Sequence, residues 1–435
     1  MTVTLVRSGL PAAAVAAVTL ILVTCGSSPV PVSDPSGAIA TATRAPTAAP
    51  TPAGPPVLGI DWGRALSVAR PEDAFALPSP GSLATPNPSD GEIRSGHPLH
   101  FPGQAMIADV AVRPAGDLVA VGYVYPGWHP QAWTSPDGRT WTLAPMGTTD
   151  FTFPVALAVG PGGALVAVGR SGPAPLSWTS VDGRSWASHQ VPTLGDGSVA
   201  ERMTTLITTP DGFLAGGSVG PELFERRARF WTSPDGIAWQ PVPDDMTAFA
   251  DAEVRAIVRS GDGYVAIGLL GSVQRYTGSV AWTSGDGRTW TRIAAPDLLK
   301  GRAIALTAAP FGGLVAVGSD LDEHEAFAWT SPDGRSWVLV PGEPSRQYPG
   351  KVRMTDVTVV GRDVIGVGNY VGLQRGTAIS WVTRDGRTWQ KAISAPVQEQ
   401  GEMYAVATAG PGIVAVGSVG APDDYIPSVW LSPGR

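Results

Sequence analysis

The sequence contains little cysteine, lysine and charge. Its single cysteine, Cys25, allows neither an intrachain disulfide nor a cysteine-based metal site within one chain. Only 15% of the 435 residues are charged, the formal net charge is −7, and lysine occurs only at Lys300, Lys351 and Lys391. An acidic chain lacks the positive field that nucleic-acid binding needs, so we expect no nucleic-acid partner.

Glycine and proline, in contrast, are abundant, at 54 and 42 residues. Both residue types favour turns. Hydrophobic residues still make up 43% of the chain, which argues against wholesale disorder and provides material for a large core. The composition therefore predicts a folded chain with many turns.

The N-terminal segment has the order of a secretory signal peptide. Arg7 precedes an apolar run over residues 12–23, which is shorter than the roughly 20 residues that span a bilayer. The following segment Leu22-Val-Thr-Cys25 resembles a bacterial lipobox, whose cysteine is lipidated and becomes the mature N-terminus. We expect residues 1–24 to be a lipoprotein signal peptide and Cys25 the lipid attachment site. The alternative is an ordinary signal peptide with an incidental cysteine.

Residues 25–56 differ in composition from the rest. After Cys25 they consist mainly of Pro, Ala, Thr and Ser, and only Asp34 and Arg44 are charged. Such a segment buries too little apolar surface to offset the entropy of ordering. It is expected to be a tether between a lipid-anchored cysteine and a folded domain.

From residue 105 onward the chain repeats. The unit Trp133-Thr-Ser-Pro-Asp137-Gly138-Arg-Thr-Trp141 recurs at Trp178, Trp231, Trp282, Trp329 and Trp381, with a truncated copy at Trp430. A second string recurs between these units, at residues 118–122, 165–169, 213–217, 264–268, 314–318, 364–368 and 413–417. Both repeats occur seven times.

Each period contains four short runs with strand composition, separated by Gly, Pro or Asp-Gly turns. In the first period these runs are residues 106–113, 118–123, 131–135 and 140–144. A period near 50 residues with four strands predicts a blade of a β-propeller. The fold class is therefore expected to be all-β, a seven-bladed β-propeller over residues 57–435.

The turn of the tryptophan unit has a defined chemistry. The oxygens of Ser135 and Asp137 can accept backbone N–H bonds, while Gly138 supplies the positive φ of a tight turn. The unit resembles the Asp-box (BNR) repeat of sialidase-like propellers, with one residue fewer before the final tryptophan. The Asp side chains are therefore predicted to be structural.

The last period has only three strands, at about residues 403–408, 413–418 and 428–432. Near the N-terminus, Gly59 to Trp62 reproduces the spacing of Gly138 to Trp141. We predict that residues 57–65 form the outer strand of blade seven and that residues 66–104 form a long connecting loop. This arrangement would close the ring and leave no open sheet edge.

The face opposite the Asp-containing turns carries the candidate ligand-binding residues. Trp128 stands outside the repeat pattern in a loop with Tyr125, and could stack on a sugar or a peptide; the alternative is that it covers blade one. Several innermost strands begin with charged residues that could bind an acidic or zwitterionic ligand: Arg202, Glu253, Arg255, Arg302, Arg353 and Glu402. The alternative for these is a solvated rim of paired charges.

The resemblance also implies a competing function, a secreted glycan-processing hydrolase of sialidase-like type. Sialidases use three arginines and a tyrosine nucleophile assisted by a glutamate, and Tyr404 lies near Glu402. However, no Arg-Ile-Pro string occurs, and sialidase propellers have six blades. The acidic run from Asp320 to Glu325 could chelate a cation, but it lacks EF-hand spacing, so no metal is assigned.

No nucleotide-binding glycine loop or Gly-x-Ser-x-Gly elbow occurs, so we expect no cofactor and binding rather than catalysis. The leading interpretation is an extracytoplasmic bacterial lipoprotein, lipid-anchored to the membrane. Its propeller would serve as a monomeric binding or scaffold module for an unknown protein or glycan ligand.

Overall fold

The computed structural model describes residues 62, 66–67, 105–125, 127–147, 149–193, 199–221, 226–342, 350–371, 376–392, 401–409, 412–419 and 426–432. The predicted signal peptide, Cys25 and the tether lie outside the described residues. So do residues 57–61 and 63–65 of the predicted closing strand, and residues 68–104 of the predicted loop.

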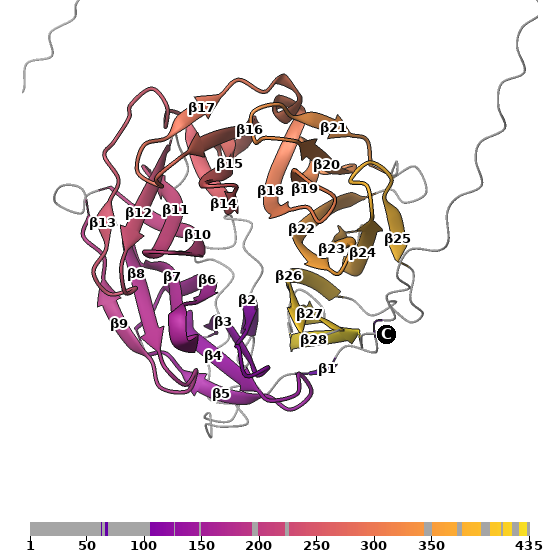
Figure 1. Cartoon of the computed structure of the whole chain (residues 1–435). Coiled ribbons are helices and arrows are strands. Elements are labelled where there is room, and N and C mark those ends of the chain that lie inside the picture. Colours follow the sequence, from indigo (N-terminus) through magenta and orange to yellow (C-terminus); the bar gives the residue numbers. More distant parts are fainter. Residues whose placement is uncertain are drawn as a thin grey trace, which may run out of the picture. The chain divides into compact units, whose positions relative to one another are not determined.

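The described residues form seven four-stranded antiparallel sheets arranged as a ring (Figure 1). Blade one contains β2 (Ala105–Val112), β3 (Leu118–Val124), β4 (His129–Ser135) and β5 (Thr142–Pro145). Blade two contains β6 (Thr152–Val159), β7 (Leu165–Ser171), β8 (Ala174–Ser180) and β9 (Ala187–Gln190). Blade three contains β10 (Glu201–Thr209), β11 (Gly212–Val219), β12 (Arg227–Ser233) and β13 (Gln240–Pro241).

Blade four contains β14 (Ala252–Ser260), β15 (Gly263–Ser272), β16 (Arg275–Ser284) and β17 (Thr291–Ile293). Blade five contains β18 (Gly301–Ala308), β19 (Leu314–Asp320), β20 (Ala326–Ser331) and β21 (Val338–Val340). Blade six contains β22 (Lys351–Val360), β23 (Asp363–Val371), β24 (Gly376–Thr383) and β25 (Gln390–Ala392). Blade seven contains β26 (Gly401–Ala409), β27 (Gly412–Val419), β28 (Ile426–Ser432) and β1 (Leu66–Ser67).

The seven-bladed propeller predicted from the repeats is confirmed. Within the described residues, the only helical segments are two 3₁₀ turns, η3 (Pro161–Gly163) and η4 (Pro296–Lys300). The second strand of each blade is the recurrent apolar string, and β3 is buried over most of its length. Such continuous burial fits a strand that is covered by neighbouring blades on both faces.

The N-terminal segment does complete blade seven, although the predicted boundary is wrong. Leu66 pairs with Val429 and Ser67 with Ser428, so the strand occupies residues that we expected to begin the connecting loop. In blade one, Ala144 pairs with Ala132 and lies three residues after Trp141, whereas Leu66 lies four residues after Trp62. One extra residue therefore separates the tryptophan from the strand, and spacing alone could not reveal it.

Each interface between neighbouring blades contains two tryptophans. Trp133 and Trp141 lie in the cluster between blades one and seven, and the same pairing recurs in the other clusters. In the cluster between blades six and seven the pair is Trp430 and Trp62. Trp62 thus occupies the place of the missing box tryptophan, as the sequence predicted.

The glycine that ends each apolar string is required by close contact between backbones. An added Cβ on Gly122, Gly217 or Gly318 would lie only 1.8–1.9 Å from a carbonyl oxygen of the innermost strand. At this level each innermost strand contains an irregularity, such as the one between Ala303 and Ala305 opposite Gly318. A β-bulge brings the two backbones together here, so only glycine fits.

We expect Gly318→Ala to lower the free energy of unfolding by about 1–3 kcal/mol, because the new methyl group must displace backbone rather than a flexible side chain. Urea unfolding followed by circular dichroism measures this loss. Gly285→Ala is the matched control, since its added Cβ would meet no atom within 4 Å. An equal effect of the two substitutions would contradict the close-contact explanation.

Candidate functional site

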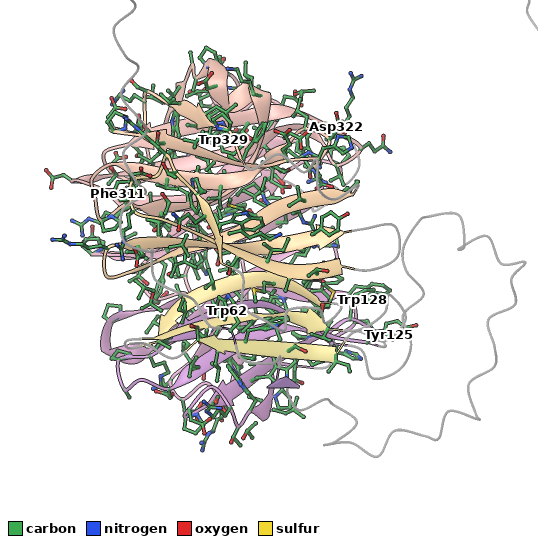
Figure 2. The ribbon with its side chains drawn as sticks, turned by 90° about the vertical axis from the view of Figure 1, so that its right-hand side faces the viewer. Trp62, Tyr125, Trp128, Phe311, Asp322 and Trp329 are labelled. Atoms are coloured by element: carbon green, nitrogen blue, oxygen red, sulfur yellow. The ribbon has the colours of Figure 1, made fainter. Side chains whose placement is uncertain are left out.

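The sheet registers define one equivalent position at the start of all seven innermost strands. It is the residue just before the partner of the recurrent glycine, and we call the seven residues the mouth ring: Met106, Phe153, Arg202, Glu253, Arg302, Arg353 and Glu402. The ring is apolar in blades one and two and charged in blades three to seven. It lies at the end of the blades opposite the Asp-containing turns, because those turns join the third and fourth strands. In Figure 2, Trp128, Tyr125 and Asp322 lie toward one face of the propeller, and Phe311 toward the other.

Glu253 is the buried centre of the first charged group. Its carboxylate contacts the guanidinium of Arg226, accepts a bond from Arg255 Nη1 at 3.0 Å and accepts another from Ser218 Oγ at 3.0 Å. Burial alone would raise the pKa of Glu253, but the guanidinium groups of Arg255, Arg226 and Arg202 hold it below its usual value. The carboxylate is therefore ionised and neutralised by several arginines.

Glu323 is the centre of the second charged group and comes from the loop between β19 and β20. Its carboxylate lies 3.1 Å from Arg302 Nη1, 3.1 Å from Lys351 Nζ and 3.5 Å from Arg353 Nη1. Although burial opposes ionisation, the nearby cations, Arg353 foremost, lower the pKa of Glu323. Glu323 therefore ties the charged residues of blades five and six together.

Arg353 connects this group to blade seven. Its Nη2 lies 3.9 Å from Glu402 Oε2, and Tyr404 donates a hydrogen bond of 2.8 Å to the same carboxylate. Burial and then the adjacent Glu402 charge raise the pKa of the Tyr404 hydroxyl well above its usual value. The Tyr404 phenol is therefore protonated in the folded protein and hydrogen-bonded to Glu402.

Acidic and basic groups occupy different depths in this part of the site. The side chain of Glu323 is 13% exposed, whereas those of Arg353 and Lys351 are 37% and 63% exposed. Glu253 is likewise buried beneath the partly exposed Arg255. Glu253 and Glu323 are therefore less exposed than the cations Arg255, Arg353 and Lys351 that pair with them.

This sector also has surplus hydrogen-bond donors. Among the described residues, no acceptor reaches the buried Nε atoms of Arg255 and Arg302 or the buried Nδ2 atom of Asn369. Asn369 uses its side-chain oxygen to accept a bond of 3.1 Å from Arg353 Nε. Buried donors without acceptors are costly, so these atoms lower the stability of this sector.

Trp128 and Tyr125 lie in the apolar sector of the same face. Their rings are 5.9 Å apart, and Trp128 also packs on Tyr123 and on Phe153 of the mouth ring. All four rings remain partly exposed. The predicted stacking residue is therefore part of a larger aromatic group, and it is not isolated on the outside of blade one.

Two carboxylates lie further along the innermost strands. Asp109 accepts bonds from the N–H groups of Val110 and of Leu157 in the next blade, and Asp356 accepts bonds from Val357 and from Val406 in the next blade. Burial raises the pKa of Asp109 to about 7, with a contribution from Asp356, and raises that of Asp356 to about 6. These residues join neighbouring blades.

The raised pKa values of Asp109 and Asp356 predict that the stability of the fold depends on pH. Because their folded-state pKa values exceed the unfolded value of about 3.9, the folded state binds more protons between these values and loses stability as pH rises toward 7. Both residues keep some exposed surface, so we expect a loss of only about 1–2 kcal/mol between pH 5 and 8. Urea unfolding at both pH values should show a smaller loss for Asp109→Asn. Asp137→Asn is the control, because backbone donors lower the pKa of Asp137. If Asp109→Asn lost as much stability between pH 5 and pH 8 as the wild type does, the pH dependence could not be assigned to Asp109.

The Asp-containing turns have the predicted structural geometry. Ser135 Oγ accepts the N–H of Gly138 at 2.8 Å, and Asp137 Oδ1 accepts those of Arg139 and Thr140 at 2.8 Å. The same bonds recur in the other five complete turns, with Thr383 in place of serine in the last of them. The carboxylates are thus occupied by their own turns.

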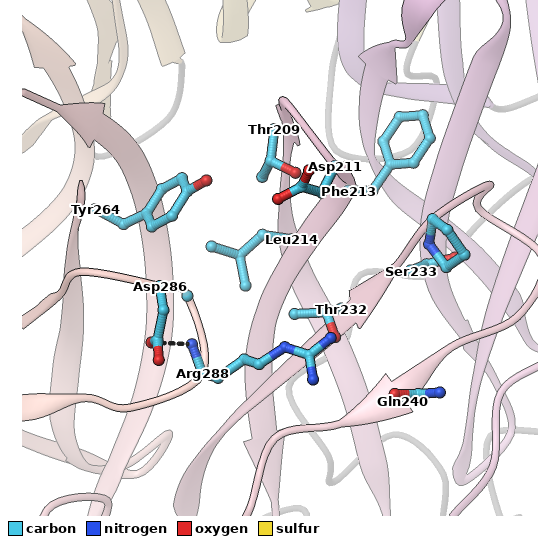
Figure 3. A pocket seen from close by; sticks show the side chains of 12 residues that line it. Thr209, Asp211, Phe213, Leu214, Thr232, Ser233, Gln240, Tyr264, Asp286 and Arg288 are labelled. Atoms are coloured by element: carbon cyan, nitrogen blue, oxygen red, sulfur yellow. Dashed lines mark hydrogen bonds between the residues drawn. The ribbon is translucent and has the colours of Figure 1, made fainter. Parts of the chain in front are cut away.

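Two clefts lie on this turn-bearing face, away from the mouth ring. The cleft in Figure 3 has a volume of about 230 Å³ and lies between blades three and four, lined by Thr209, Asp211, Leu214, Tyr264 and Asp286 among others. Its neighbour, of about 470 Å³, shares Tyr264 and Asp286. Neither cleft contains any of the predicted site residues.

The acidic run on the other face is arranged as a local loop. Ligand atoms of Asp320, Asp322 and His324 lie within 4.8 Å of one another, but Asp320 Oδ1 already accepts the N–H of Glu325 at 2.9 Å. Two of the three residues are exposed. We assign no metal to this loop, whose principal contribution to the site is Glu323.

The structure brings most of the predicted charged residues together and adds others. Arg302 and Arg353 both pair with Glu323, and Arg353 also lies near Glu402. Arg202 acts electrostatically on Glu253. The predicted site residues did not include Glu323, Arg226, Lys351, Asn369, Tyr123 or Phe153, although Glu323 lies in the acidic run noted in the sequence. Aligning the innermost strands on the recurrent glycines would have found Phe153, whereas the reach of Glu323 across blades leaves no signal in the spacing.

None of the described residues belongs to a helix long and apolar enough to cross a membrane. No family model matches the sequence, and no curated protein matches it either. Among solved structures, the chain is similar to YCF48 bound to a D1 peptide, with 17% identity and a TM-score of 0.52 over 78% of this chain and 94% of that chain.

Two further structures are less similar. A Trypanosoma rangeli sialidase in complex with 2,3-difluorosialic acid has 11% identity and a TM-score of 0.47 over 77% of this chain and 55% of that chain. A protein from Lactobacillus plantarum has 11% identity and a TM-score of 0.49 over 70% and 91%. Of the three structures, only the one of YCF48 has a TM-score above 0.5, and at 17% identity that similarity shows the fold alone.

Proposed function

We propose that this chain is an extracytoplasmic lipoprotein whose propeller binds anionic peptide or protein ligands at the charged sector of the mouth ring. The observation that carries the proposal is the layering of charge, with exposed cations above the buried Glu253 and Glu323. Guanidinium groups bind carboxylates through paired, charge-assisted hydrogen bonds. The buried carboxylates hold the cations in place without covering them.

Two further considerations support a peptide ligand. The partly exposed cations Arg255, Arg302 and Arg353 lie in blades four, five and six, so a ligand with several acceptors matches them better than a single small anion. A propeller of similar fold, YCF48, is bound to a peptide, which supports the proposed ligand class. The hydrolase interpretation requires arginines that converge on a substrate carboxylate, whereas Arg302 and Arg353 both pair with Glu323 of the chain itself.

The anchoring part of the proposal depends on Cys25 in its lipobox-like context. Expression with radiolabelled palmitate should label the wild-type chain and leave Cys25→Ala unlabelled. Fractionation should find the wild type in the membrane fraction and Cys25→Ala outside it. Labelling or membrane retention equal to wild type in Cys25→Ala would overturn the anchor.

The binding part is tested with two fluorescein-labelled decapeptides, one alternating glycine and glutamate and the other alternating glycine and lysine. We expect fluorescence anisotropy to show binding of the glutamate peptide only, weakened by added salt. Arg302→Gln should weaken binding by at least about tenfold, through loss of a charge-assisted hydrogen bond. Arg335→Gln, an exposed arginine on the turn-bearing face, is the matched control. Equal binding of both peptides, or equal effects of both substitutions, would overturn the proposal.

A further inference from the structure

The apolar sector of the mouth ring is a built structure with unusual backbone. Trp128 and Phe151 both adopt positive φ, at 59° and 52°, which is uncommon for non-glycine residues and costs free energy. Two backbone bonds maintain it: Phe151 N–H donates to Gly127 O at 2.7 Å, and Thr152 N–H donates to Trp128 O at 2.9 Å. These bonds fasten the loop after β3 to the connection between blades one and two.

The result is a fixed group of aromatic rings, which we call the aromatic cluster: Tyr123, Tyr125, Trp128 and Phe153. Trp128 is central, with ring centroids at 5.4 Å from Tyr123, 5.7 Å from Phe153 and 5.9 Å from Tyr125. Arg170 lies over the Phe153 ring at 4.6 Å, and the nearby Phe151 is 58% exposed. A group of rings held in place by the backbone loses little entropy when it binds a ligand.

The aromatic cluster is continuous with the charged sector. Tyr404 donates a hydrogen bond to Glu402, which lies beside Arg353 of the charged sector. Tyr123 of the aromatic cluster is close enough to Tyr404 to raise the Tyr404 pKa, although burial and Glu402 raise it more. The same ring of equivalent positions thus changes from charged to apolar between blade seven and blades one and two. A single extended ligand could contact both sectors.

We propose, building on the binding function above, that the aromatic cluster is a second subsite for the same ligand, and that this ligand is a peptide carrying an aromatic side chain at a fixed distance from its carboxylates. The ring arrangement favours an aromatic side chain over a sugar. Tyr125 meets Trp128 at 76° and Tyr123 meets Phe153 at 79°, so these pairs pack edge to face and form no flat, stacked surface. A sugar stacks best on an open, flat face.

The experiment uses the glycine–glutamate decapeptide with one phenylalanine placed at successive distances from a terminal pair of glutamates, and alanine peptides of the same design. At one spacing the phenylalanine peptide should bind the wild type about fivefold more tightly than its alanine counterpart, as expected for an aromatic pair. Trp128→Ala should remove this gain, so that the variant binds the phenylalanine and alanine peptides with equal affinity. Trp128→Phe should restore part of the gain, and Phe311→Ala, on the opposite face, should retain all of it.

The outcomes separate the two proposals. If the glutamate peptides bind and depend on Arg302, but phenylalanine gives no gain at any spacing or the gain survives Trp128→Ala, the second subsite is wrong and the charged site stands. If no glutamate peptide binds, the proposed function itself fails. Trp128-dependent binding of a cello-oligosaccharide, without any phenylalanine gain, would overturn the assignment to a peptide side chain.

Discussion

Trp62→Ala should lower the free energy of unfolding by about 3–5 kcal/mol, the usual cost of removing a large aromatic side chain from a core. Trp62 is 1% exposed and packs with Trp430, Val367 and Val382 between blades six and seven. Its indole N–H also donates a bond of 2.8 Å to Ser380 Oγ, which would lose its partner. The loss is measured by urea or thermal unfolding of the wild type and the variant.

The position of Trp62 makes this result informative about ring closure. It belongs to the N-terminal segment, separated by 318 residues from Ser380. Trp128→Ala provides the control, because that tryptophan is only partly buried and does not belong to the buried clusters on either side of blade one. A cost for Trp62→Ala no larger than for Trp128→Ala would mean that the segment does not close the ring in solution.

Glu253→Ala should also cost about 3–5 kcal/mol, because it removes one partner of a buried ion pair. The side chains of Glu253 and Arg226 are 5% and 3% exposed, so the variant loses a buried carboxylate that contacts a buried guanidinium. Ser218 Oγ loses its acceptor as well. Chemical unfolding at neutral pH, where Glu253 is ionised, measures the cost.

A double-mutant cycle identifies the cause. Replacing both Glu253 and Arg226 by alanine removes both buried charges, so the double variant should be less destabilised than the sum of the two single variants. Additive costs within experimental error would show that the two charges do not stabilise one another. The cycle is independent of ligand binding, so it tests the electrostatics of the site separately from its proposed function.

Much of the fold could be predicted because each repeat carries its own structural signals. The Asp-containing turn indicates a tight connection between the third and fourth strands of a blade, and the two tryptophans indicate where those strands lie. The number of repeats then gives the number of blades, seven. The reason for the glycine at the end of each apolar string could not be predicted, because it depends on a bulge in another strand. The end of the closing strand was predicted too early for a similar reason, because the extra residue between Trp62 and Leu66 has no counterpart in the other blades.

The candidate site was less predictable. Charges at Arg302, Arg353 and Glu402 could be recognised at repeat-related positions, but their pairing depends on Glu323, whose backbone adopts a φ of 62° in its loop. Neither that conformation nor its reach into the next blade is visible in the sequence. The layering of acidic residues below basic ones is likewise a property of side-chain depth, which residue spacing does not encode.

The central claim is that exposed arginines of the mouth ring select an anionic ligand, and a charge reversal at Arg353 tests it most directly. Calorimetric titration should show that Arg353→Glu loses affinity for the glycine–glutamate decapeptide by at least about tenfold, whereas Arg335→Glu on the opposite face does not. The same reversal should improve binding of the glycine–lysine peptide. Equal affinity of wild type and Arg353→Glu for both peptides would contradict the claim.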